Sequence, residues 1–160
     1  MNTLIRNGQV VEDGWQWIDA DEALPAARLE TGGRLLLPLA LWLAHRASLD
    51  PARAGVWLGP DDELESVLPW LADMPLIAIR FPVFTDGRGY SLARLLRNRH
   101  GYRGELRAVG DVLRDQLYFL HHCGFDAFLL RADQLPHEAL AAFRDYSWEP
   151  VTGRRVSPSM

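Results

Sequence analysis

The chain has 160 residues, 48% of them hydrophobic, a size and composition that predict one globular domain over residues 1–160 and exclude a disordered protein. The net charge of −4 disfavours nucleic-acid binding, which relies on a basic surface. All 17 basic residues are arginines, so chemistry that needs a lysine is excluded, and the single cysteine, Cys123, excludes an internal disulfide and a thiolate metal cluster.

The N-terminal third predicts a small β-ribbon followed by a buried helix. Its first residues lack the basic and apolar regions of a signal peptide, so we expect a cytoplasmic protein. Two short strands, Leu4–Arg6 and Trp15–Ile18, with the Asn7-Gly8 turn signal after the first, indicate a ribbon within residues 1–20. Apolar residues on nearly every side then predict a buried helix over Leu35–Ala47. This stretch is shorter than the roughly 20 residues that span a bilayer, so we expect no membrane segment.

The rest of the chain alternates short apolar runs with helical patterns. Such alternation predicts an α/β fold of repeated βα units with a small, mainly parallel sheet, either an open sheet or a partial barrel. The predicted strands are Gly55–Gly59, Leu76–Phe81, Glu105–Val109 and Ala127–Leu130. The predicted helices are Glu63–Ala72, Ser91–Arg99, Leu113–His122 and Pro136–Tyr146. Residues 151–160 are expected to form a flexible tail.

Three segments of the second half resemble a known bacterial family. They are Phe81–Arg97 (FPVFTDGRGYSLARLLR), Gly104–Leu117 (GELRAVGDVLRDQL) and Cys123–Phe128 (CGFDAF). They are similar to a family of unknown function whose members carry the label of probable oxidoreductases of sulfite reduction. The resemblance implies a link to assimilatory sulfur metabolism. It supplies no catalytic residue and no cofactor, and the chain has neither a G-x-G-x-x-G motif opening a helix nor a cysteine pair.

Polar loops follow the predicted strands, and in parallel α/β folds such loops meet at one edge of the sheet, where ligands bind. The most informative loop combines two glycines, which allow a close backbone approach, with an arginine and a predicted helix start at Ser91. We expect a small anion such as sulfite, phosphate or a carboxylate to bind there. The candidate ligand-binding residues are Thr85, Asp86, Gly87, Arg88, Gly89, Tyr90, Ser91, Asp111, Arg114 and Arg131.

The same residues also fit two other interpretations. In the first, Asp86-Gly87 makes a tight turn, Ser91 caps a helix, and Arg88 pairs with Asp86 or Asp111 to tie the loops together. In the second, the two aspartates form a carboxylate pair that performs acid–base work or holds a cation. The sequence leaves these alternatives open.

We expect no dedicated metal site. The cluster from His121 to Cys123 occupies adjacent positions of a predicted helix, so its side chains point in different directions and do not converge on one ion. Trp15, Trp17 and Trp148 lie near the ends of the chain, where aromatic side chains suit an interface. A homodimer is therefore one expectation.

Two functions from different classes fit these observations. The first is an accessory protein of assimilatory sulfite reduction that binds a small anion, sulfite reductase or another sulfur-assimilation enzyme through the strand-end loops. The second is an enzyme, an oxidoreductase by the family's label, that acts on a small anionic substrate at Asp86, Arg88 and Asp111, with Arg88 neutralising charge and an aspartate moving protons. We favour the first, because nothing in the sequence supplies an electron carrier or an activated nucleophile.

Overall fold

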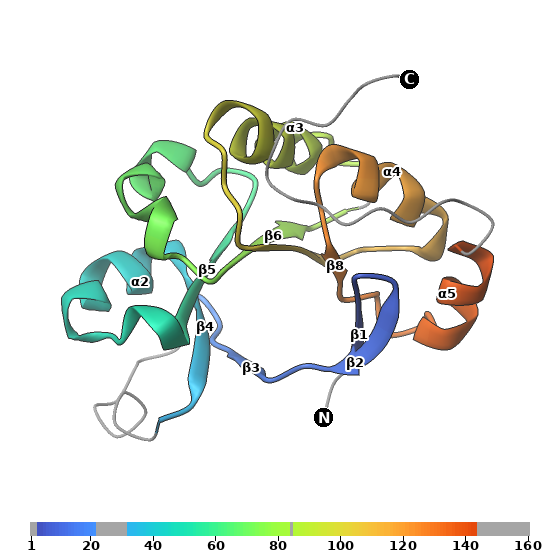
Figure 1. Cartoon of the computed structure of the whole chain (residues 1–160), viewed down its shortest axis with the longest axis horizontal. Helices are drawn as coiled ribbons and strands as arrows, with labels where there is room; N and C mark the ends of the chain where they lie inside the picture. Colours follow the sequence, from blue (N-terminus) through green and yellow to red (C-terminus); the bar gives the residue numbers. More distant parts are fainter. Residues whose placement is uncertain (1–2, 22–31, 84, 144–160) are drawn as a thin grey trace.

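The computed structural model describes residues 3–21, 32–83 and 85–143, which contain one eight-stranded sheet with helices packed outside it (Figure 1). The strands are β1 (Thr3–Arg6), β2 (Gln9–Glu12), β3 (Trp15–Trp17), β4 (Arg34–Pro38), β5 (Ala54–Leu58), β6 (Leu76–Phe81), β7 (Glu105–Gly110) and β8 (Ala127–Phe128). The helices are α2 (Leu39–His45), α3 (Arg88–Arg94), α4 (Leu117–Cys123) and α5 (Pro136–Phe143), with a π-helical segment, η5 (Leu95–Arg99), directly after α3. The 3₁₀ segments are η1 (Arg46–Ser48), η2 (Pro51–Arg53), η3 (Leu64–Ser66), η4 (Leu68–Asp73) and η6 (Arg114–Gln116).

The order of the strands explains the shape of the sheet. That order is β2-β1-β8-β7-β6-β5-β4-β3, so from β3 to β8 each strand pairs in parallel with the next one along the chain. Strand β1 pairs antiparallel with both β8 and β2. Parallel neighbours in chain order are the arrangement of (βα) barrels, and here they form a curled, open sheet, a half-barrel. The predicted α/β fold, mainly parallel sheet and N-terminal strands are confirmed.

The central strands are buried on both faces, because alternate residues of a strand point to opposite sides of the sheet. On the outer face, Ile77 and Ile79 of β6 and Leu106 of β7 join the main core with side chains of α3, η5 and α4. On the inner, concave face, Leu76 and Ala78 of β6 belong to a second apolar cluster. Strands covered on both faces read as continuous apolar runs, which is how these segments appear in the sequence.

The concave face is filled by aromatic side chains near the open edges of the sheet. Trp17 of β3 stacks on Trp57 of β5 with ring centroids 4.6 Å apart, and the indole N–H of Trp57 donates to the carbonyl oxygen of Ile18 at 3.0 Å. The edge strands β2 and β3 are consecutive in the chain, with Asp13 and Gly14 alone between them (Figure 1). So short a connection holds the two open edges close to each other.

Two predictions for the N-terminal third are wrong. The strand that pairs with β1 in the ribbon is β2, which was not predicted. The predicted partner, the strand at Trp15, is β3 and pairs with β4. The predicted helix over Leu35–Ala47 begins as strand β4 and becomes helical only at Leu39. A strand buried on both faces and a buried helix have the same apolar pattern. Pro38 is the last residue of β4 and directly precedes α2.

Several predicted helices also differ from the structure. The segment Glu63–Ala72 forms the 3₁₀ segments η3 and η4, since Pro69 lacks the N–H that a continuous α-helix needs. Helix α3 begins at Arg88, three residues before the predicted start, and α4 begins at Leu117 after the 3₁₀ segment η6. The end of the last predicted helix, at Tyr146, and the tail 151–160 lie outside the described residues. Within the described part of the chain, no helix is both long and apolar enough to cross a membrane.

Candidate functional site at the strand-end rim

The loops that follow β5, β6, β7 and β8 lie at one edge of the sheet, because these strands are parallel. We call this edge the strand-end rim; its described residues are 59–63, 82–83, 85–88, 110–115 and 129–135. The predicted candidates Asp86 and Arg88, Asp111, and Arg131 come from three of these loops. The rim is therefore the edge of the sheet at which ligand binding was predicted from the sequence.

Arg88 is the centre of the first ion-pair group on the rim. Its Nη2 donates to Oδ2 of Asp86 at 2.8 Å, and its Nη1 donates to Oδ1 of Asp61, in the loop after β5, at 2.9 Å. The Nε and backbone N–H of Arg88 also donate to Oδ1 of Asp86, each at 3.1 Å. These hydrogen bonds lower the pKa of Asp86 and raise the pKa of Arg88. The arginine thus joins the loops after β5 and β6.

Arg131 is the centre of the second ion-pair group. Its Nε donates to Oδ1 of Asp133 at 2.7 Å, and its Nη1 donates to Oδ1 of Asp111, in the loop after β7, at 2.9 Å. The backbone N–H of Asp111 donates to the carbonyl oxygen of Phe81 at 2.8 Å, which fixes this loop against the end of β6. Hydrogen bonds to both carboxylates raise the pKa of Arg131. This arginine joins the loops after β7 and β8.

The predicted constellation is therefore divided between two groups. Asp86 and Arg88 bond to each other, whereas Asp111 bonds to Arg131. The additional carboxylates, Asp61 in one group and Asp133 in the other, were not among the predicted site residues. Their only signal in the sequence is their position just after a strand. Of the interpretations left open, the structure has the Arg88–Asp86 pair, which lies within the loop after β6, whereas the tie between two loops is the Arg88–Asp61 pair.

The residues around the start of α3 have packing contacts as well as rim positions. Gly89 is buried, and a Cβ there would lie 2.6 Å from the ring of Phe81. Tyr90 packs against Phe81 with ring centroids 5.2 Å apart, and its hydroxyl accepts from Nε2 of Gln116 at 2.9 Å. Ser91 lies inside α3 rather than at its start, so its predicted capping role is wrong.

The remaining candidates are exposed positions on the rim or near it. Thr85 is exposed, and Gly87 is the N-cap of α3 with an ordinary φ of −80°. The backbone N–H of Arg114 donates to Oε1 of Gln134 at 3.1 Å, and its side chain is exposed. None of these contacts identifies a bound ligand.

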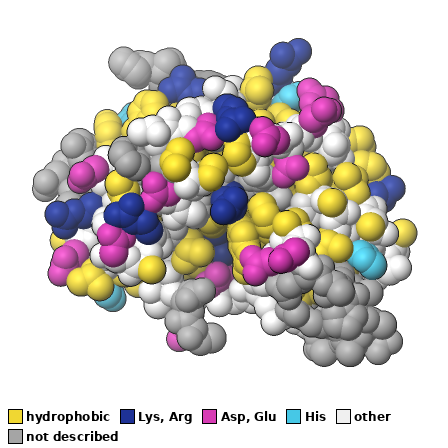
Figure 2. Space-filling view, turned by 180° about the vertical axis from the view of Figure 1, so that it is seen from behind, with side chains coloured by type: hydrophobic (Ala, Val, Ile, Leu, Met, Phe, Trp, Pro, Cys, Tyr) yellow, Lys and Arg dark blue, Asp and Glu magenta, His cyan; other side chains and the backbone are white. Residues whose placement is uncertain are grey.

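The rim carries an excess of negative charge. Its described residues include seven carboxylates and three arginines, a net charge of −4. The acidic residues are Asp61, Asp62, Glu63, Asp86, Asp111, Asp115 and Asp133, and the basic ones are Arg88, Arg114 and Arg131. On the face of the molecule in Figure 2, acidic and basic side chains are interspersed without a continuous basic area.

The histidine and cysteine cluster from the sequence lies on α4, away from the rim loops. His121 contacts the carbonyl oxygen of Phe125 through Nδ1 at 3.3 Å, and the ring of His122 packs edge-on against Tyr118. Cys123 is buried, and this burial raises the pKa of its thiol. Among the described residues, no group of three or more histidine, cysteine, aspartate or glutamate side chains is placed to hold a metal ion.

Fold and rim together define an α/β half-barrel whose strand-end loops are cross-linked by ion pairs. The chain belongs to a family described as bacterial proteins of unknown function, DUF934, whose model matches residues 55–150. The match runs from β5 to beyond α5 and includes all four rim loops. No curated protein and no solved structure matches the chain significantly. The family description names no activity.

Proposed function

We propose that this protein is an accessory protein of assimilatory sulfite reduction that docks on the reductase through the strand-end rim. The proposed pathway rests on the resemblance of the segments that include the rim loops after β6 and β7. The observation that supports docking is that two rim arginines, Arg88 and Arg131, are each held between two carboxylates from adjacent loops. Loops tied in this way form a surface that loses little conformational entropy when a partner binds.

The charge of the rim favours a protein partner over a free small anion. A sulfite ion at Arg88 or Arg131 would compete with two carboxylates that already bond to each guanidinium. It would also meet the net charge of −4 of the rim. A partner surface rich in arginine and lysine is instead attracted by that excess. The proposed docking surface of the reductase is therefore basic.

Copurification with sulfite reductase tests the docking step. The wild-type protein should retain the reductase, and the double variant Glu63→Gln/Asp115→Asn should lose most of it. Both side chains are exposed and have no ion-pair partner within the described residues, so the Arg88 and Arg131 groups stay intact. Asp50→Asn is the control, because it removes an exposed carboxylate at the opposite edge of the sheet and keeps the oxygen that accepts from Ala52.

Two further measurements separate the parts of the proposal. Calorimetric titration with sulfite and phosphate should give no binding to the wild-type protein. Sulfite binding that disappears in Arg88→Ala, in a protein that retains no reductase, would replace the docking proposal with a small-anion site. Deletion of the gene should create a requirement for cysteine or methionine on sulfate medium, and growth without that requirement would contradict the pathway.

A further inference from the structure

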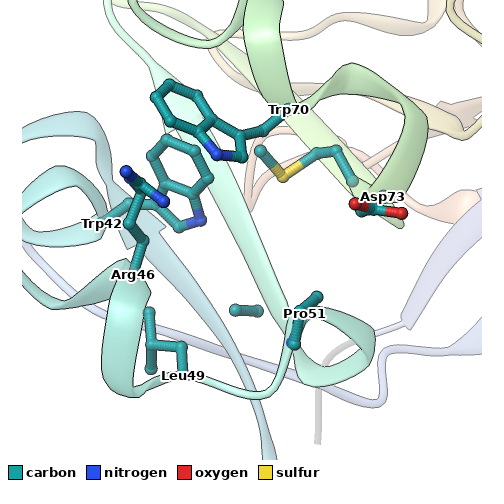
Figure 3. A pocket seen from close by; sticks show the side chains of 8 residues that line it. Trp42, Arg46, Leu49, Pro51, Trp70 and Asp73 are labelled. Atoms are coloured by element: carbon teal, nitrogen blue, oxygen red, sulfur yellow. The ribbon is translucent and has the colours of Figure 1, made fainter.

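A small cavity lies at the edge of the sheet opposite the strand-end rim. It has a volume of about 90 Å³ and is lined by residues of α2, of η1 and η2 and their flanks, and of η4 and the residue after it (Figure 3). Ala54, the first residue of β5, and Met74 form its apolar floor, and both are buried. No pattern in the sequence predicts this cavity, since its tryptophans, Trp42 and Trp70, fall in apolar patterns typical of the core.

Two tryptophans and an arginine form one wall of the cavity. Trp42 and Trp70 pack edge to face with ring centroids 5.7 Å apart. The guanidinium carbon of Arg46 lies 3.9 Å from the centre of the Trp70 ring. In this cation–π contact the N–H donors point outward in the plane of the guanidinium group, where they can bind an acceptor. Asp73 lies on the other side of the cavity from Arg46 (Figure 3). Opposite charges therefore flank an apolar floor.

The polar groups of this cavity lack partners within the described residues. Trp42 is 5% exposed, yet no acceptor in the described part of the chain receives its indole N–H. The indole nitrogen itself is not fully buried, because the fully buried side-chain donors without a partner among the described residues are Nη2 of Arg97 and Nη2 of Arg107. The N–H of Trp42 is therefore open to an acceptor from outside the chain. The side chains of Arg46 and Asp73 likewise have no hydrogen bond or ion pair to any described residue, in contrast to those of Arg88 and Arg131 on the rim.

We propose that this cavity binds a small zwitterion of the α-amino acid type. Its carboxylate accepts from Arg46 and from the indole N–H of Trp42, its ammonium group donates to Asp73, and its short side chain contacts Ala54 and Met74. A dry 150 Å³ cavity holds benzene, which has six non-hydrogen atoms, so about 90 Å³ in proportion holds roughly four non-hydrogen atoms of a ligand. Glycine and alanine are the α-amino acids nearest to this size, and the rest of each molecule lies at the mouth of the cavity. The site is independent of the strand-end rim and of its proposed partner.

Ligand titration followed by calorimetry and by indole N–H signals in NMR spectra tests this proposal. We expect L-alanine and glycine to bind at millimolar concentration, because so small a ligand makes few contacts. Propionate lacks the ammonium group and ethylammonium lacks the carboxylate, so each should bind at least about tenfold more weakly. L-Tryptophan is too large for the cavity and should not bind.

Variants of the cavity connect binding to the named side chains. Arg46→Gln and Asp73→Asn should each weaken L-alanine binding at least about tenfold. Trp42→Phe keeps the ring and removes only the N–H donor, and should weaken binding by a smaller factor. Arg103→Gln, at an exposed arginine outside the cavity, is the matched control and should bind like the wild-type protein. Far-ultraviolet circular dichroism checks that each variant is folded.

Three results would overturn the proposal. They are the absence of L-alanine binding at millimolar concentration, equal affinity for L-alanine and propionate, and unchanged binding in folded Arg46→Gln or Asp73→Asn protein. A rim variant that no longer retains the reductase should still bind L-alanine, since the two sites lie at opposite edges of the sheet. The two proposals therefore fail independently.

Discussion

Nη1 of Arg107 lies 3.0 Å from Oδ1 of Asp13, although the two residues are 94 positions apart in the chain. Arg107 is in the middle of β7 on the concave face and is 1% exposed. Its Nε also donates to Oε2 of Glu105 at 2.9 Å, whereas its Nη2 approaches the same carboxylate to 2.7 Å without hydrogen-bond geometry. A buried arginine thus ties the connection between the open edges to the centre of the sheet.

Loss of this arginine should destabilise the fold strongly. Arg107→Gln is expected to lower the free energy of unfolding by about 3 kcal/mol, because Asp13 then remains largely buried without its cation and Glu105 keeps only the half-exposed Arg6. Urea unfolding measures this change. Arg6→Gln is the control: Arg6 is 41% exposed and pairs with Glu105 at 3.5 Å, so its loss should cost less than about 1 kcal/mol. Equal losses in the two variants would contradict the role assigned to Arg107.

Gly110 should not tolerate a side chain. Its φ of +95° is a conformation that residues with a Cβ avoid, and a Cβ there would clash with the carbonyl oxygen of Phe81. Gly110→Ala is therefore expected to lower the free energy of unfolding by at least about 2 kcal/mol. Gly87→Ala has an ordinary φ and open space around the new methyl group. It should change the stability by less than about 1 kcal/mol in the same urea measurement, because the lower entropy of the unfolded chain is opposed by the poorer fit of alanine at an N-cap.

Asp126 should make stability depend on pH in a defined direction. Its burial raises the pKa to about 6, while Arg97 and the backbone N–H of Leu106 oppose the shift. A raised pKa favours the protonated carboxyl in the folded state, so its contribution is present below about pH 4 and is lost as the pH rises through about 6. Relative to Asp126→Asn, whose amide does not titrate, the wild-type protein should lose about 3 kcal/mol over that interval.

Urea unfolding of both proteins at a series of pH values measures this difference. Acid unfolding driven by other carboxylates is common to the two proteins and cancels in the comparison. A difference in unfolding free energy that stays constant from pH 4 to pH 7 would show that Asp126 does not titrate in this range. A gain in stability of the wild-type protein relative to Asp126→Asn as the pH rises would contradict the sign.

The parallel core of the fold could be predicted because its signals are local. Strand β6 has the predicted bounds, β5 begins and ends one residue before the predicted strand, and β7 ends one residue after it. Each is a continuous apolar run, which a strand covered on both faces requires. Strand β4 was predicted as helix for the same reason, since its apolar run continues without a break into α2.

The contacts that organise the candidate site and close the sheet had no local signal. Asp61 and Arg88 are 27 positions apart, and Asp13 and Arg107 are 94 apart, so no spacing in the sequence connects them. The rim loops could be located because they follow strands, but the partner of each arginine depends on how adjacent loops meet in space. The cavity at Trp42 and Trp70 likewise depends on the packing of α2 against η4, which sequence periodicity does not encode.

The association rate of this protein with sulfite reductase tests the docking proposal most directly. If the acidic rim attracts a basic surface, the wild-type rate should fall steeply as salt is added, and Glu63→Gln should lower both the rate and its salt dependence. Asp50→Asn, which removes the same charge at the opposite edge, should match the wild-type protein. Equal rates and equal salt dependence for Glu63→Gln and Asp50→Asn, or no association at low salt, would contradict docking through the strand-end rim.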